Sequence, residues 1–168
     1  MRKIVAALFA VLIVGCTTID CPVQNSVETG FTLKKPNGTI DTLNTDTLTV
    51  WTHRINYSEE EGIDTVLINR LCGAKGTTFN THISHTQPED TLFTVLEDNK
   101  GNAYLDTICI LKENYPHFES VDCHATYFHK ITAIKSTRYG IDSIILNKPA
   151  VNYDKQTDNI YLYLKADR

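Results

Sequence analysis

The stretch TLFTVLEDNKGNAYLDTICILKEN, residues 91–114, decides the fold of this chain. Two runs rich in Thr, Val, Ile, Leu and Tyr, 91–98 and 103–114, flank the polar loop NKGN at 99–102. β-Branched and aromatic residues favour strands, and a Gly in a short polar loop supplies the positive φ that a tight turn requires. The stretch therefore predicts a β-hairpin.

Short strand-forming runs separated by Asp, Asn, Gly and Pro continue on both sides of this hairpin, and no helix-period stretch stands out. Further strands are expected at 31–35, 48–55, 63–71, 77–83, 123–136, 140–148 and 159–165. In the last run aliphatic residues alternate with tyrosines, so one face is expected to be buried. This spacing predicts an all-β fold, an antiparallel β-sandwich that is Ig-like or a partly closed barrel.

The N-terminus MRKIVAALFAVLIVGC has the order of an export signal. Arg2 and Lys3 precede an apolar run that is far shorter than the ~20 residues a membrane-spanning helix needs. Its end, IVGC, resembles the bacterial lipobox, in which the Cys thiol is acylated before the chain is cut on its amino side. The alternative is a plain signal peptide with an incidental Cys. The lipobox reading predicts acyl chains on Cys16 that hold the protein to a membrane.

This reading divides the chain into a lipoprotein signal peptide at 1–15, a lipidated tether at 16–26 and a single β-sandwich domain at 27–168. The position after the lipobox Cys is Thr17. In the bacterial sorting rules that this N-terminus resembles, Asp at that position signals retention in the inner membrane, so Thr17 implies an outer-membrane location. No acidic run follows Cys16, which favours a periplasm-facing anchor over surface export.

The net charge of −4 and the lack of a Lys/Arg cluster argue against nucleic acid and anionic headgroups as ligands. The expected partners are therefore membrane lipid, through acylated Cys16, and an outer-membrane protein.

Four cysteines follow Cys16, at positions 21, 72, 109 and 123. An even number in an exported chain predicts two disulfides, with three possible connectivities, and unpaired core thiols are the alternative. No CxxC pair occurs, so neither a thioredoxin-like motif nor a zinc ribbon is indicated.

The six histidines do not predict a metal site. His82 and His85 are separated by three positions, and His124 and His129 by five, so on a strand each pair points to opposite faces. The chain also lacks GxSxG, HExxH and phosphate-binding Gly loops, and Ser84 beside His85 is only a dipeptide. We therefore expect no metal, no cofactor and no catalytic activity.

The tripeptide Asp-Thr/Ser-aliphatic occurs six times, beginning at residues 41, 46, 64, 90, 106 and 142. It resembles the O-glycosylation signal of Bacteroidota envelope proteins, whose central hydroxyl carries the glycan. Candidate sites are Thr42, Thr47, Thr65, Thr91 and Thr107, with the first two favoured because they lie in a polar segment. The alternative is conformational, since Asp closes turns and Thr opens strands.

The segments GCTTIDCPVQNSV and GIDSIILNKPAVNYDKQTDNIYLYL resemble a family of small Bacteroidota envelope lipoproteins known only as a domain of unknown function. The resemblance implies a disulfide between Cys21 and Cys123, which leaves Cys72 and Cys109 as a second pair. It implies no activity, ligand or catalytic residue.

The expected function is that of an outer-membrane lipoprotein acting as a non-catalytic binding or interaction module in the envelope. The alternative is a small-ligand or glycan-binding lipoprotein in which Trp51 and some tyrosines form an aromatic platform, although Trp51 is expected in the core. An envelope hydrolase with a scattered His, Ser and Asp set is the third possibility, and it requires a pocket with converging polar groups.

Overall fold

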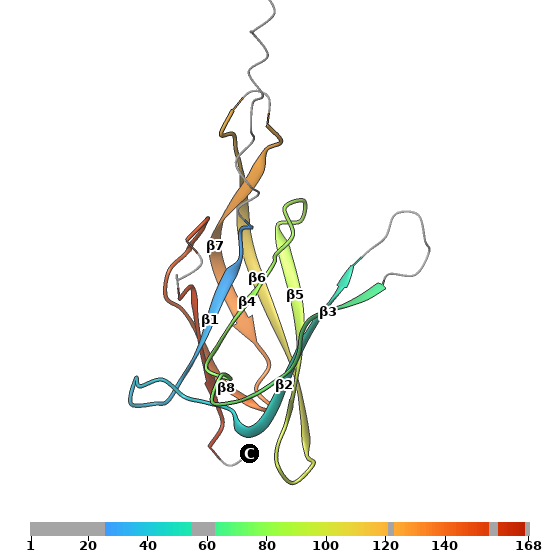
Figure 1. Ribbon diagram of the computed structural model, residues 1–168, viewed down its shortest axis with the longest axis vertical. Helices are drawn as coiled ribbons and strands as arrows, with labels where there is room; N and C mark the ends of the chain where they lie inside the picture. Colours follow the sequence, from blue (N-terminus) through green and yellow to red (C-terminus); the bar gives the residue numbers. More distant parts are fainter. Residues whose placement is uncertain (1–25, 55–62, 121–122, 155–157, 167–168) are drawn as a thin grey trace, which may run out of the picture.

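The computed structural model describes residues 26–54, 63–120, 123–154 and 158–166, and Figure 1 shows this part of the chain as strands and loops. The strands form two sheets. The four-stranded sheet has the order β4 (Thr78–Thr81), β1 (Thr29–Lys34), β10 (Ile160–Leu164), β8 (Ile141–Leu146). The six-stranded sheet has the order β3 (Ile63–Gly73), β2 (Asn44–Arg54), β5 (Glu89–Glu97), β6 (Ala103–His117), β7 (Thr126–Ser136), β9 (Ala150–Val151).

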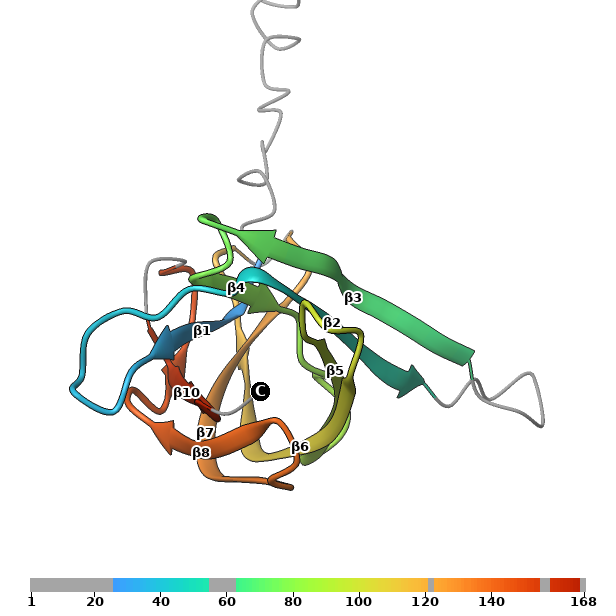
Figure 2. The ribbon, with the colours of Figure 1, turned by 90° about the horizontal axis from the view of Figure 1, so that it is seen from below.

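The two sheets face each other, and the larger one curls around the shared interior (Figure 2). The predicted all-β sandwich is therefore confirmed. No helix of the described residues has the length and apolar character needed to cross a membrane.

The hairpin predicted from residues 91–114 is present as β5 and β6, whose antiparallel register begins at Glu97 opposite Ala103. Gly101 has a φ of 86° in the connecting turn. The Asp98 carboxylate accepts hydrogen bonds from the backbone amides of Lys100 and Asn102, both at 2.8 Å. These bonds satisfy turn amides that no strand partner reaches, so the turn and the strand pattern specify the same register.

All the other expected strands are present within a few residues, and β9 is the strand that the sequence pattern missed. It has only two residues and follows Pro149, so it has no periodicity to read. One pairing is parallel, between β1 and β10, with Phe31 opposite Ile160. The sheet is thus not purely antiparallel, because the first and last strands of the domain run side by side in the same direction.

The core lies between the two sheets and is aliphatic, with one aromatic pair. Phe31 of β1 stacks on Phe79 of β4 with ring centroids 4.7 Å apart. The predicted alternation in β10 is confirmed, since Ile160, Leu162 and Leu164 are buried and the two tyrosines between them are not. Burying each aliphatic side chain contributes about 1.5–3 kcal/mol relative to exposing it.

The expected second disulfide is wrong, because Cys72 and Cys109 are both free. Cys72 of β3 is level with Thr47, Glu97 and Ala103 across the sheet, and Ala103 lies six residues before Cys109 on β6. Three strand spacings of ~4.8 Å and six residues of ~3.3 Å separate the two cysteines. A disulfide requires Cα atoms within about 7 Å. The two cysteines were paired only because they remained after Cys21 and Cys123. The sequence does not give the order of strands in the sheet, and this order is what separates Cys72 from Cys109.

Candidate functional site

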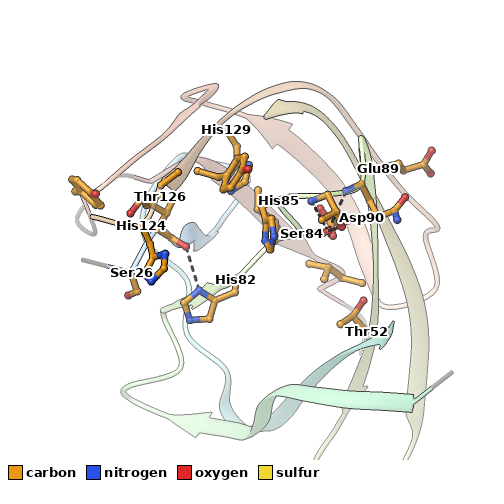
Figure 3. A pocket seen from close by; sticks show the side chains of 18 of the residues that line it. Ser26, Thr52, His82, Ser84, His85, Glu89, Asp90, His124, Thr126 and His129 are labelled. Carbon is orange, nitrogen blue, oxygen red and sulfur yellow. Dashed lines mark hydrogen bonds between the residues drawn. The ribbon is translucent and has the colours of Figure 1, made fainter. Parts of the chain in front are cut away.

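A cavity of about 870 Å³ opens at the end of the domain where the described chain begins (Figure 3). Its walls are formed by Ser26, which precedes β1, by the end of β2 and by the loop between β4 and β5. The start of β5 and the segment that leads into β7 complete them. We call this cavity the histidine pocket. Five of the six histidines in the chain line it: His53, His82, His85, His124 and His129.

The histidines are held by different contacts, which the chain spacing does not reveal. Nδ1 of His82 lies 3.2 Å from the Val27 carbonyl oxygen. The His85 ring stacks on Tyr127 with centroids 4.9 Å apart. Neighbouring histidines in sequence were expected to point apart, but a loop and strands far apart in the chain bring them to one cavity. Within the described residues, no three His, Cys, Asp or Glu side chains are placed to hold a metal ion.

A buried ion pair joins Asp90, which lines the histidine pocket, to Lys112 of β6. The Lys112 side chain is 0% exposed, and its Nζ lies 2.5 Å from Oδ2 of Asp90, which is 12% exposed. Nζ also donates to the Gln87 carbonyl oxygen at 2.6 Å, and Oδ1 of Asp90 accepts the Ser84 amide at 3.0 Å. Both charges are therefore paired and hydrogen-bonded, which offsets much of their desolvation cost. The pair fastens the loop between β4 and β5 to β6.

His129 is the buried member of the pocket histidines, with 5% of its surface exposed. Burial lowers its pKa from 6.5 to about 4, and the positive charges of Lys112 and His85 add to the shift. Nδ1 lies 2.7 Å from the amide oxygen of Asn114, an atom that only accepts. Nδ1 therefore carries the proton of the neutral ring, which leaves Nε2 as a hydrogen-bond acceptor.

Because the pKa of His129 is lower in the folded than in the unfolded protein, its contribution to stability is complete above pH 6.5 and falls as the pH drops towards 4. We expect this contribution to decrease by about 2 kcal/mol between pH 7.5 and pH 5. Urea unfolding at both values checks it. His129→Gln should remove most of the decrease, whereas the exposed His124→Gln should retain it. Equal pH dependence in both variants would show that His129 is not the group responsible.

The dipeptide Ser84-His85 does not form a nucleophile and base in this structure. Oγ of Ser84 lies 3.1 Å from Oγ1 of Thr86 and accepts the backbone amide of Gln87 at 3.2 Å, which is a local turn. The His85 ring is stacked on Tyr127. The two side chains thus have separate structural partners.

Trp51 does not belong to the buried core, contrary to expectation. It lies on the outer face of the six-stranded sheet, where it stacks on Phe93 with centroids 5.7 Å apart. Val66, 57% exposed, is opposite Trp51 in the register, and Leu105, 54% exposed, lies on the same face. Val50, the preceding residue of β2, is buried, and alternation along the strand then sends Trp51 outward. We call these four side chains the outer patch.

The five threonines of the Asp-Thr-aliphatic tripeptide are all half-buried. Thr42 lies in the loop before β2 and donates to the Gly73 carbonyl oxygen at 2.9 Å, and Thr47 on β2 donates to Oε2 of Glu97 at 3.1 Å. Thr65, Thr91 and Thr107 lie within β3, β5 and β6 rather than on turns. Glycosylation at these positions stays a prediction.

The signal peptide, Cys16 and Cys21 lie outside the described residues. Cys123 lies in the wall of the histidine pocket, close to where the described chain begins at Ser26. Its pairing with Cys21 stays a prediction.

Sequence patterns had not singled out Lys112, Asp90 and Asn114 as a group. The sequence does contain one signal for Lys112. It continues the alternation of Ile108 and Ile110, which are both buried, and so lies on the inward face of β6. A lysine in phase with core residues indicates a buried, paired charge.

The model of one protein family, described as a family of unknown function (DUF6452), matches residues 47–164. This match runs from β2 to the end of β10 and therefore includes most of the histidine pocket. No curated protein and no solved structure matches the chain.

Proposed function

The chain belongs to the family of unknown function DUF6452, and we propose from its own residues that it is an outer-membrane lipoprotein that binds a small polyhydroxylated ligand, such as a saccharide, without transforming it. The observation that carries this proposal is the histidine pocket. Its volume of about 870 Å³ lies within the ~300–1,000 Å³ of small-molecule sites, and its polar groups converge from several elements.

The lining of the pocket suits a neutral ligand with many hydroxyl groups. The carboxylates of Glu89 and Glu119 and the hydroxyl of Thr126 offer hydrogen-bond partners at separate points of the wall. The stacked rings of His85 and Tyr127 together add a flat, apolar surface to the wall. The carboxylates disfavour an anionic ligand. A saccharide combines hydroxyls with apolar ring faces and so matches both features.

The proposed location rests on the N-terminal sequence. The lipobox-like IVGC supports acylation of Cys16 and a periplasm-facing anchor in the outer membrane. Cys123 stands at the end of the domain where Ser26 begins, which is compatible with a disulfide to Cys21 in the segment before it. Such a bond would hold the domain close to its anchor.

The proposed absence of catalysis rests on the engagement of the polar groups. His129 is neutral and hydrogen-bonded to Asn114, and Asp90 is neutralised by Lys112. Ser84 accepts hydrogen bonds within its own turn. These groups stabilise the wall of the pocket and offer no activated nucleophile next to a free base.

A pair of matched substitutions tests the pocket. Ala125 lines it, whereas Ala133 lies on the outer face of β7 opposite Leu111. We expect Ala125→Phe to abolish binding of envelope saccharides by filling the cavity, and Ala133→Phe to leave binding unchanged. Titration of the intact lipoprotein with a saccharide panel, followed by NMR or calorimetry, measures both. Binding that survives Ala125→Phe, or no binding by the unaltered protein, would refute the ligand proposal.

A second candidate function is docking to an outer-membrane protein, and the outer patch favours it. Trp51 and Phe93 form a stacked aromatic pair next to exposed Val66 and Leu105. Aromatic side chains in a partly exposed cluster are typical of protein interfaces. Recovery of the same envelope protein by the unaltered chain and by Ala125→Phe, but not by Leu105→Glu, would support this function.

A further inference from the structure

The hairpin of β6 and β7 projects beyond the neighbouring strands (Figure 1), and aromatic side chains cluster at its end. Phe118 is 65% exposed and Tyr115 is 46% exposed. Behind them the His117 ring stacks on Phe128 at 4.3 Å, and Tyr153 meets Phe128 edge-on at 4.9 Å. We call these five side chains the aromatic tip. The three inner rings pack on one another, whereas Phe118 and Tyr115 keep much of their surface exposed, and the Tyr115 hydroxyl donates to the carboxylate of Glu113.

The aromatic tip lies at the end of the domain where the described chain begins. Ser26 and Glu119, which is next to Phe118 in sequence, line the same cavity. Residues 17–25 lie between Cys16 and Ser26, and the ten Cα–Cα steps from Cys16 to Ser26 span at most about 35 Å. Any lipid on Cys16 therefore keeps Ser26, at this end of the domain, within about 35 Å of the bilayer.

We propose that the aromatic tip docks into the interfacial layer of the membrane that carries the lipid anchor; this rests on the proposed acylation of Cys16. Tyr is favoured at this layer because its ring enters the acyl boundary while its hydroxyl stays among the headgroups, and Phe is favoured there because its wholly apolar ring is buried at that boundary. Glu113 lies opposite the exposed Lys130 in the register, and Glu119 follows Phe118, so the tip has no excess of positive charge and its preferred surface is electrically neutral.

Docking would give the lipoprotein a fixed orientation. The acyl chains alone leave the domain free to rotate on its tether, whereas a second contact restricts it. Because Glu119 and Ser26 also line the histidine pocket, the docked domain would present that pocket next to the headgroup layer. The opposite end, with the turn between β7 and β8, would face away from the membrane.

The test places a single tryptophan at either end of the intact, acylated protein. The chain has one Trp, so Trp51→Phe supplies a silent background that keeps the ring stack with Phe93. Phe118→Trp then reports on the tip. Tyr139→Trp is the matched control, because Tyr139 is 66% exposed. Tyr139 comes three residues after Ser136, whose partner in the register is Ile108. Ile108 lies nine residues from His117 along β6, which corresponds to about 30 Å. The control residue is therefore at the opposite end of the hairpin.

Both proteins are reconstituted in neutral phosphatidylcholine vesicles with and without bromine on the acyl chains. We expect bromine to remove about half of the emission of the Phe118→Trp protein and to leave that of the Tyr139→Trp protein unchanged. Equal emission from Phe118→Trp in both vesicles, in a protein that carries the acyl mass and floats with them, would overturn the docking alone. Absence of the acyl mass on Cys16 would overturn the lipoprotein proposal and the docking together.

Discussion

Lys112→Ala is expected to lower the free energy of unfolding by about 3–5 kcal/mol, because it leaves the Asp90 carboxylate buried without its cation. Nζ of Lys112 lies 2.5 Å from Asp90 and 2.6 Å from the Gln87 carbonyl oxygen, and its side chain is 0% exposed. The variant also releases the loop between β4 and β5, which carries six residues of the histidine pocket, positions 82–87. The proposed binding of a saccharide should therefore weaken in this variant as well.

Urea unfolding at pH 7 measures this loss, and two further variants identify its cause. Lys130→Ala removes an exposed lysine from neighbouring β7 and is expected to cost less than about 0.5 kcal/mol. The double variant Lys112→Met, Asp90→Leu replaces both charges with apolar groups of similar size, so we expect it to recover most of the stability lost by Lys112→Ala. A double variant no more stable than Lys112→Ala would mean that packing, and not an unpaired charge, causes the loss.

Asp106→Ala is expected to cost about 3–4 kcal/mol, since it leaves several buried backbone amides without acceptors. One carboxylate oxygen accepts the Thr137 hydroxyl and the Tyr139 amide, both at 2.7 Å. The other accepts the amides of Gly140 at 2.7 Å and Ile141 at 2.9 Å. Asp106 is only 1% exposed, and it connects β6 to the turn that leads from β7 into β8.

Thr137→Ala removes one of these bonds and should cost about 1 kcal/mol, which provides a scale for the larger change. Denaturant unfolding of both variants measures the difference. A loss no greater for Asp106→Ala than for Thr137→Ala would show that the backbone amides find other partners.

The same carboxylate should make stability depend on acid. Burial by itself raises the pKa of Asp106, but the hydrogen bonds from Tyr139, Thr137, Ile141 and Gly140 outweigh it and hold the pKa below its ordinary value. The contribution is therefore complete above the unfolded pKa of ~3.9 and is lost as the pH falls through the lower folded value. Asp106→Asn should remove this acid dependence, and the exposed Asp142→Asn should not.

Strand positions followed from the sequence because a strand alternates its side chains and a turn needs particular residues. The hairpin at 91–114 was predicted in full, since its runs, its Gly and its polar loop are all local. The Asp-Thr-aliphatic tripeptide was a weaker guide. Two of its aspartates, Asp90 and Asp106, have buried structural roles that attention to the threonines alone does not reveal.

The sequence by itself determined the class of fold, the expected strands, the inward face of β10 and membership of a family, because these depend on local spacing and on similarity along the chain. Tertiary structure alone decided which distant residues meet. It kept Cys72 far from Cys109, turned Trp51 outward, placed Lys112 on Asp90 and gathered five histidines around one cavity. The physical reason is that alternation sets the face of a side chain within its strand, whereas the order of strands in a sheet sets its neighbours.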